Sequence, residues 1–276
     1  MAVQTSDPAA ASMAVHTTAP AGCAADWTVP QGWGHYTAVE HALWDRLFHQ
    51  QCALLPSRVT PEFLDGVKLL ALTGWRVVAV PGLVPDEVFF EHLANRRFVA
   101  GSFLRKPEQV DYLQEPDVFH DVFGHVPLLA HPVFADYLQA YGQGGQRAQG
   151  LGVLPLLARL YWYTVEFGLV RSAAGLRIYG AGIVSSRTES LFSLDDAAPH
   201  RLGFDLQRVM RTRYRIDDFQ QTYFVIDSFE DLLEQTLRTD FGPLYKASAG
   251  AEELDPATVL PTDRVLTRGT QALNRA

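Results

Sequence analysis

The sequence predicts an α-rich α+β fold, with many helices and a few short strands in a single main domain. Three observations lead to this prediction. Apolar residues recur at helical spacing along most of the chain, the strand-like runs are short and scattered, and strands and helices do not alternate regularly as in a Rossmann sheet or a barrel. The chain has 276 residues, of which 47% are hydrophobic, so it is long enough to enclose a continuous core.

Helical spacing, with capping and stop signals, predicts helices at 38–55, 60–72, 85–96, 117–124, 132–141, 155–170 and 228–238. Runs of branched and aromatic residues predict strands at 75–80, 98–104, 176–179 and 222–226. Gly142, Gly144 and Gly145 follow the 132–141 helix, which favours a helix end and a flexible connection there.

Composition divides the chain into three parts. Residues 1–26 are rich in Ala, Thr, Ser and Pro and contain no aromatic residue, so we expect a flexible tail. Residues 27–245 carry the predicted elements and form the main domain. Residues 246–276 are sparser in large apolar groups, and we expect a loosely packed C-terminal tail.

Charge and cysteine usage exclude several classes of protein. The 31 acidic and 23 basic residues give a net charge of −8, so nucleic acid and membrane surfaces are poor partners. The run of Arg208, Arg211, Arg213 and Arg215 is interpreted as a solvated or ion-paired face. Two cysteines outside any CxxC motif indicate a reducing, cytoplasmic location. The most apolar stretch, 151–170, contains Pro155, Arg159 and Glu166 and is therefore a buried helix rather than a membrane span.

The segment EPDVFHDVFGHVP (115–127) places His120 and His125 in an apolar run. Two histidines five residues apart point about 140° away from each other on an ideal α-helix. They can meet at one ion only if the last turn unwinds, which Gly124 permits. Neutral imidazoles suit a divalent first-row metal, although such a pair on its own is also typical of core histidines.

A carboxylate in a buried helix is the second unusual feature. Glu166 lies in the segment YWYTVEFGLV (161–170), which is apolar on every side. Such a group costs several kcal/mol unless a metal or a cation compensates it. The alternative is an ion pair with Arg159, about 10 Å away along the helix axis.

Together, His120, His125 and Glu166 form a 2-His-1-carboxylate set, the arrangement of non-haem Fe(II) oxygenases. A structural zinc site needs four ligands, so this set argues against one. Ligand type alone leaves a catalytic zinc open.

Three motifs resemble, in order and spacing, those of the pterin-dependent aromatic amino acid hydroxylases. They are EPDVFHDVFGHVPLL (115–129), YWYTVEFGLV (161–170) and YGAGIVSS (179–186), and the resemblance runs from Trp33 to Arg238. It implies a single catalytic domain of that type, which hydroxylates L-phenylalanine to L-tyrosine in phenylalanine catabolism. It also implies Fe(II), O₂ and a tetrahydropterin (tetrahydrobiopterin or a bacterial analogue) as cofactor and co-substrates. Tryptophan or tyrosine hydroxylation by the same chemistry is the alternative.

The resemblance also assigns roles to individual residues. Its metal ligands are His120, His125 and Glu166; its substrate contacts are Arg105, Pro116, Trp162, Ser185 and Ser186; its pterin contacts are Gly82, Leu83, Phe89, Asp121 and Tyr161. No catalytic side chain beyond the iron centre is implied. Animal members carry glutamate at the position of Asp121, so the shorter side chain here changes that contact. No long heptad helix closes the sequence, so we expect a monomer.

Two other classes of function are alternatives to this one. The His120-Asp121 dipeptide is typical of HD-type metal phosphohydrolases, which need a further histidine and aspartate, for which His41, His92 and Asp136 are the candidates. The second alternative is a non-enzymatic binding module, which would be favoured if the purified protein bound neither iron nor pterin.

Overall fold

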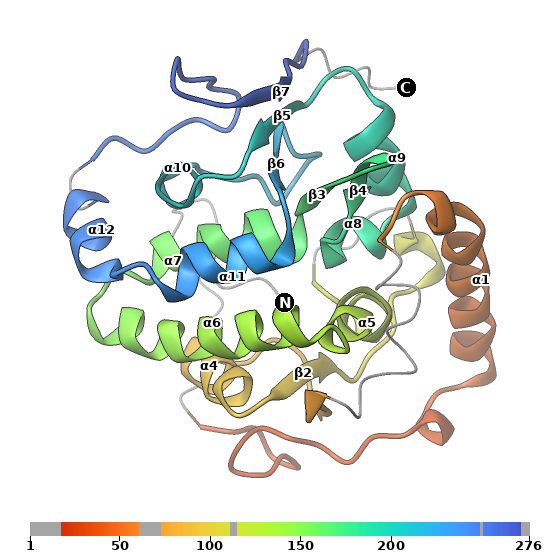
Figure 1. The fold of residues 1–276 in the computed structure, drawn as a ribbon. Coiled ribbons are helices and arrows are strands. Elements are labelled where there is room, and N and C mark those ends of the chain that lie inside the picture. Colours follow the sequence, from red (N-terminus) through yellow and green to blue (C-terminus); the bar gives the residue numbers. More distant parts are fainter. Residues whose placement is uncertain (1–17, 61–72, 111–114, 249–250, 272–276) are drawn as a thin grey trace.

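The computed structural model describes residues 18–60, 73–110, 115–248 and 251–271. Its centre is helical (Figure 1): α6 crosses the molecule, with α11 packed on one side of it and α4 on the other. The larger sheet lies beyond α11, and α1 covers one flank. This arrangement confirms the α-rich α+β prediction.

The helices of the described residues carry the labels of Figure 1. The α-helices are α1 (Ala38–Leu54), α4 (Asp86–Ala94), α5 (Val126–Leu129), α6 (Pro132–Gly150), α7 (Leu154–Tyr161), α8 (Ala181–Val184), α9 (Arg187–Asp195), α10 (Leu206–Arg211), α11 (Phe229–Leu237) and α12 (Phe241–Ser248). The 3-10 and π turns are η1 (Trp33–His35), η2 (Leu55–Ser57), η4 (Pro107–Gln109), η5 (His120–His125) and η6 (Trp162–Glu166).

The described strands form two sheets. They are β1 (Arg76–Val80), β2 (Arg97–Gly101), β3 (Leu169–Ser172), β4 (Gly175–Ile178), β5 (His200–Gly203), β6 (Thr222–Ile226) and β7 (Val265–Thr267). β1 and β2 pair in parallel, and the other five follow the order β4-β3-β6-β5-β7. β6 is central, runs parallel to both neighbours and is buried at all five residues, as its apolar sequence TYFVI requires.

The structure corrects the predicted end of the 132–141 helix, because α6 continues through the three glycines to Gly150. The reason is helix packing against α4. A Cβ on Gly142 would lie 2.5 Å from the main-chain nitrogen of Ala94, and a Cβ on Gly145 would lie 2.0 Å from the ring of Phe90. These glycines therefore permit close contact inside a helix and do not end it.

The predicted helix over 155–170 is also shorter than expected. α7 changes into the π turn η6, and Leu169 and Val170 then begin strand β3. The predicted strand over 98–104 is observed as β2, which begins and ends a little earlier. Residues 61–72 of the helix predicted at 60–72 lie outside the described residues. No helix in the described ranges is both long enough and apolar enough to cross a membrane.

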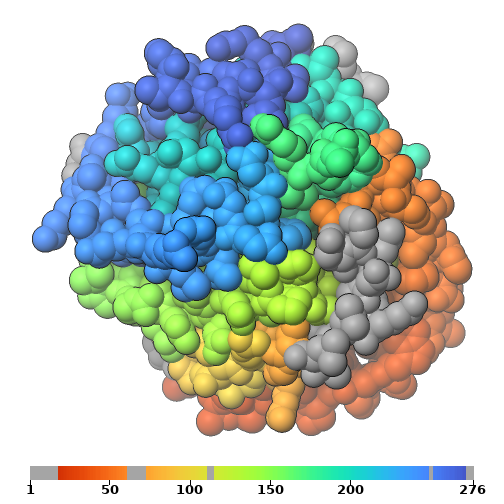
Figure 2. Space-filling model, viewed as in Figure 1, coloured from red at the N-terminus to blue at the C-terminus, as the bar shows by residue number. Residues whose placement is uncertain are grey.

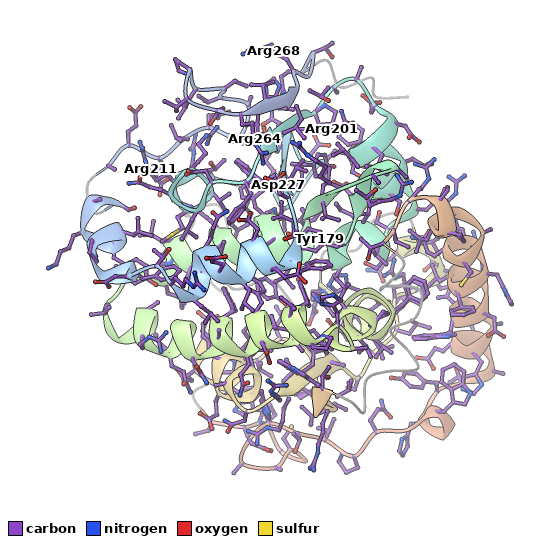
Figure 3. The ribbon with its side chains drawn as sticks, viewed as in Figure 1. Tyr179, Arg201, Arg211, Asp227, Arg264 and Arg268 are labelled. Carbon is purple, nitrogen blue, oxygen red and sulfur yellow. The ribbon has the colours of Figure 1, made fainter. Side chains whose placement is uncertain are left out.

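The described part of the C-terminal segment lies on the surface of the domain and contacts it at several points. Residues 251–271 cross one face of the molecule (Figure 2) and add β7 to the edge of the larger sheet. Arg208 forms an ion pair with Asp263 at 3.0 Å, and both side chains are buried. Arg264, from this segment, reaches Asp227 at 2.9 Å (Figure 3). The buried Arg208–Asp263 pair is the stronger of these two contacts, because an exposed ion pair contributes little to stability.

Three of the four arginines in the predicted face form ion pairs, and one of the three, Arg208, is buried. Arg213 pairs with Asp255 at 3.3 Å, and Arg215 pairs with Asp217 at 2.9 Å. Arg211, at the end of α10 (Figure 3), donates to the main-chain oxygen of Glu252. The arginine run therefore serves the attachment of the C-terminal segment and the loop after α10.

Candidate metal centre

His120 and His125 lie at the two ends of the π turn η5. Asp117 precedes the turn and accepts a hydrogen bond from the main-chain N–H of His120 at 2.9 Å, as a helix-start residue should. A π turn has i→i+5 hydrogen bonds, so residues five apart lie one above the other. The Nε2 atoms of the two histidines are therefore only 3.1 Å apart.

The turn between the histidines is wider than an α-helical turn, which confirms the expected unwinding. Gly124 is required for a different reason from the one inferred from the sequence. A Cβ on Gly124 would lie 2.9 Å from the main-chain oxygen of Ala181. The glycine thus permits α8 to pack directly against the turn that carries both histidines.

Glu166 is brought to the same point by the second π turn, η6. Its Oε1 lies 3.3 Å from His125 Nε2, and its Oε2 lies 3.4 Å from His120 Nε2. All three side chains are buried, with 9%, 2% and 3% of His120, His125 and Glu166 exposed. The alternative partner, Arg159, pairs with Glu253 instead.

These distances fit a single metal ion. Ligand atoms at right angles around an ion with bonds of about 2.1 Å lie about 3 Å apart. Burial lowers the pKa of His120 well below its usual value of 6.5, so its imidazole is neutral, as a metal ligand must be. The residues present therefore fit a 2-His-1-carboxylate centre on one face of an ion.

Asp121 is a second carboxylate close to the histidines. It, His120 and His125 offer ligand atoms within 4.8 Å of one another. Asp121 Oδ2, however, accepts a hydrogen bond from the main-chain N–H of Gly101 at 2.8 Å. The two oxygens of Glu166, by contrast, lie 3.3 Å from His125 Nε2 and 3.4 Å from His120 Nε2. We therefore favour Glu166 as the third ligand.

Ser185 fixes the orientation of the His120 ring. The Ser185 hydroxyl donates to the main-chain oxygen of Ala181 at 2.8 Å, and His120 Nδ1 lies 2.8 Å from the same hydroxyl oxygen. Since the hydroxyl proton is already used, Nδ1–H of His120 must be the donor. This tautomer leaves the lone pair of Nε2 directed at the metal position.

Arg105 is buried, and a buried carboxylate holds it. Its Nε and Nη2 donate to the two oxygens of Asp117 at 2.8 and 2.9 Å. Its guanidinium also lies over the ring of Phe119. One edge of the guanidinium is thus occupied by the protein, while Nη1 makes only a long 3.4 Å contact with the Val110 oxygen.

The other predicted substrate contacts lie on three different elements. Pro116 is half-buried just before η5, and its main-chain oxygen approaches Gly101. Trp162 begins η6, one turn from Glu166. Ser186 caps α9 by accepting a hydrogen bond from the N–H of Glu189 at 3.3 Å. Chain segments far apart in sequence are therefore assembled around the two π turns.

The predicted pterin contacts fall into two groups. Gly82 and Leu83 form a half-buried loop after β1, and the N–H of Leu83 donates to Glu115 Oε1 at 3.4 Å. Phe89 and Tyr161, by contrast, are each 1% exposed and pack edge to face with a ring separation of 5.7 Å. Both rings are therefore part of the core in this structure. For Phe89, the reason is that α4 turns its side chain towards the core.

Several residues that organise the site are not among the predicted site residues. Glu115 supports the Gly82 loop, and Asp117 holds Arg105. Both belong to the EPD motif, so their place in that motif was the available signal. Gln220, which hydrogen-bonds the Trp162 indole, gave no signal because it lies in an ordinary polar loop.

The residues needed for a phosphohydrolase do not join this cluster. His41 stacks on Trp33, and His92 contacts Asp26 and Arg97 through its two ring nitrogens. Asp136 is exposed and pairs with Arg96. The HD alternative therefore lacks its further ligands.

Comparison with known proteins agrees with this geometry. The model of the biopterin-dependent aromatic amino acid hydroxylase family matches residues 35–242. The chain is 61% identical to a phenylalanine-4-hydroxylase of Caulobacter vibrioides over 271 residues, covering 92% of each chain. It is 58% identical to that of Chromobacterium violaceum over 262 residues, covering 88% of each.

Solved structures give the same result. The crystal structure of Chromobacterium violaceum phenylalanine hydroxylase with iron and phenylalanine bound matches with a TM-score of 0.84 and 54% identity, covering 90% of this chain and 96% of that one. Its cobalt-bound form matches with a TM-score of 0.85 and 56% identity, covering 90% and 95%. The chain therefore belongs to the biopterin-dependent aromatic amino acid hydroxylase family.

Proposed function

We propose that this protein is a phenylalanine 4-monooxygenase, which converts L-phenylalanine to L-tyrosine with O₂ and a tetrahydropterin at a non-haem Fe(II) centre. The family and the 58–61% identity to phenylalanine-4-hydroxylases support the activity. The single observation that carries the proposal is the approach of His120 Nε2, His125 Nε2 and the Glu166 carboxylate to within 3.1–3.4 Å of one another.

His120, His125 and Glu166 would hold the iron. When bound, iron and pterin together supply the oxygen activation and electron transfer that amino-acid side chains cannot provide. The protein contributes a set of ligands on one face, with the remaining positions left for the reactants. It also keeps water away, because all three ligands are buried.

Arg105 would bind the carboxylate of phenylalanine. Asp117 occupies the Nε and Nη2 edge, so the substrate carboxylate is assigned to the Nη1 edge. Asp117 holds the guanidinium in place, so a carboxylate bound there would fix which carbon of the substrate ring lies nearest the metal position. Pro116 and Trp162 would contact the substrate ring, and Ser185 and Ser186 would border its carboxylate.

The pterin would lie against the loop at Gly82 and Leu83, beside Asp121. Main-chain amides of a glycine-containing loop can approach a flat heterocycle closely, and a carboxylate can accept its N–H groups. Phe89 and Tyr161 would then support this wall from the core, in keeping with their 1% exposure.

The activity assay is direct. Purified protein should convert phenylalanine to tyrosine only when ferrous iron, O₂ and a synthetic tetrahydropterin are all supplied, with tryptophan and tyrosine tested in parallel. Absence of tyrosine under these conditions, with iron bound at one equivalent, would exclude the proposed function.

We also propose that the protein acts as a monomer in the cytoplasm. Cys23 and Cys52 are free, which suits a reducing compartment. Among the described residues, the last helix, α12, has only eight residues and is too short for a coiled coil. Light scattering at working concentration should give the mass of one chain, and a larger mass would refute the monomer.

A further inference from the structure

Trp162 is held by the loop that follows α10. Its indole stacks on the ring of Tyr214, with centroids 4.2 Å apart and planes inclined by 14°. Its Nε1–H donates to Gln220 Oε1 at 2.9 Å. Tyr163, the next residue, donates its hydroxyl to the main-chain oxygen of Arg213 at 2.5 Å. The loop from 213 to 220 therefore contacts the start of η6 through one stacked ring pair and two hydrogen bonds.

The orientation of the Gln220 amide is determined by its surroundings. Its Nε2 donates to the main-chain oxygen of Arg215 at 2.8 Å and lies 3.5 Å from that of Asp218. Two carbonyl oxygens on one side require the NH₂ group there, so Oε1 must face the indole. Gln220 is 3% exposed, and water cannot replace it as the partner of the buried indole N–H.

Gln220 also contacts Glu189, a residue of helix α9. Its main-chain N–H donates to the carboxylate of Glu189, and the same carboxylate accepts the hydroxyl of Tyr223. Glu189 lies in the first turn of α9, the helix that Ser186 caps. One buried residue thus connects the start of η6 with the start of α9.

We propose that Gln220 is a positioning residue for the hydroxylation, which sets the plane of the Trp162 indole relative to Ser186 and so fixes the slot for the substrate ring. This role rests on the proposed function, in which Trp162 and Ser186 border phenylalanine. Gln220 itself touches neither metal ligand nor substrate. It acts by preventing rotation of the indole, one turn from the metal ligand Glu166.

The test replaces the amide by a side chain of equal length. Gln220→Met keeps the unbranched shape but removes both hydrogen-bonding groups. We expect a several-fold higher KM for phenylalanine and several-fold less tyrosine formed per pterin oxidised, with iron content unchanged. A loosely held ring reacts less often each time the pterin is consumed.

Gln139→Met is the matched control. Gln139 also accepts from a side-chain Nε–H, that of Arg96 at 2.8 Å, and donates to a main-chain oxygen, that of Ala94 at 3.0 Å. It lies between α6 and α4. Gln139→Met should lower the Tm while leaving KM and the tyrosine-to-pterin ratio unchanged.

A double variant separates positioning from general destabilisation. Trp162→Phe removes the indole N–H. Adding Gln220→Met to this variant should therefore cause little further loss of coupling, which is the amount of tyrosine formed per pterin oxidised. An equal loss in both backgrounds would overturn the proposal, as would wild-type KM and coupling in Gln220→Met.

The final measurement does not depend on activity. In protein labelled with ¹⁵N-tryptophan, the indole resonance that disappears in Trp162→Phe should shift in Gln220→Met and stay in place in Gln139→Met. If the Trp162 indole resonance did not shift in Gln220→Met, the positioning role of Gln220 would be refuted and the proposed function would be unaffected. Failure of wild-type protein to form tyrosine would instead remove the proposed function, and with it this role in the reaction.

Discussion

The imidazole of His120 donates its Nδ1–H to the hydroxyl of Ser185 across 2.8 Å, and Ser185 donates in turn to the main-chain oxygen of Ala181. Helix α8 therefore determines which nitrogen of a proposed metal ligand carries the proton. The α8 backbone can come this close because Gly124, in η5, has no side chain. The proposed metal site thus depends on a helix that supplies none of its candidate ligands.

Removal of the Ser185 hydroxyl should weaken iron binding. Ser185→Ala frees the His120 ring to adopt the other tautomer or to rotate, and loss of such an outer partner costs about 10–100-fold in metal affinity. Competition with a chromogenic chelator measures the change. Ser190→Ala is the control, because Ser190 donates to the main-chain oxygens of Ile183 and Ser186 in the same region but touches no ligand. Equal iron affinity in the two variants would contradict the assignment.

The ligand set itself is tested by removing one ligand at a time. Glu166→Gln and His120→Ala should each lose stoichiometric iron and tyrosine formation while remaining folded, because fewer than three ligands hold the ion poorly. Iron content and circular dichroism check both points. Asp121→Asn should retain iron, since Asp121 is bound to the Gly101 amide. Loss of iron in Asp121→Asn, with retention in Glu166→Gln, would replace Glu166 by Asp121 as the third ligand.

Much of the metal centre was predictable from the sequence, and its geometry was not. His120, His125 and Glu166 stood out because polar groups in apolar runs need a reason to be there. The sequence indicates that the turn between the histidines must unwind, but not that it forms a π turn, because π turns arise from tertiary packing and have no residue signal comparable to a cap. The same limit applies to Gly142 and Gly145. Glycine after a helical pattern usually marks its end, and only the neighbouring α4 shows that these two lie inside α6.

The C-terminal segment shows a different limit. Its few apolar residues predict loose packing but not its contacts, in which Asp263 and Arg264 form ion pairs with Arg208 and Asp227. Each partner lies tens of residues away in the sequence. Charge pairs at that separation cannot be identified from composition, since every charged residue has many alternative partners.

Glu189 should make the stability of the protein pH-dependent. Burial raises the pKa of Glu189 to about 7, despite the hydrogen bond from Tyr223. The folded state then binds more protons than the unfolded state, whose glutamate titrates near 4.5. This contribution to stability is fully present below about pH 4.5 and is lost as pH rises through about 7, with a total on the order of 1–3 kcal/mol.

The measurement compares urea unfolding of wild type and Glu189→Gln between pH 5 and pH 8.5. The difference in unfolding free energy, wild type minus variant, should fall as pH rises across this range and level off above it. Glu230→Gln, at an exposed position of α11, should show no such trend. A difference that stays constant with pH would mean that Glu189 is ionised throughout.

The contact between α6 and α4 leads to a paired prediction on stability. A Cβ on Gly145 would lie 2.0 Å from the Phe90 ring, so Gly145→Ala should destabilise the protein by about 1–3 kcal/mol as the two helices are forced apart. A Cβ on Gly144, one residue earlier, would make only ordinary contacts at 3.9 Å. Gly144→Ala should therefore stabilise by about 0.5–1 kcal/mol, because alanine favours the helix over glycine. Urea unfolding of wild type and both variants measures these changes in the free energy of unfolding. If Gly145→Ala proved as stable as Gly144→Ala, α6 and α4 would not pack as closely as described, and the account of the glycines inside α6 would be wrong.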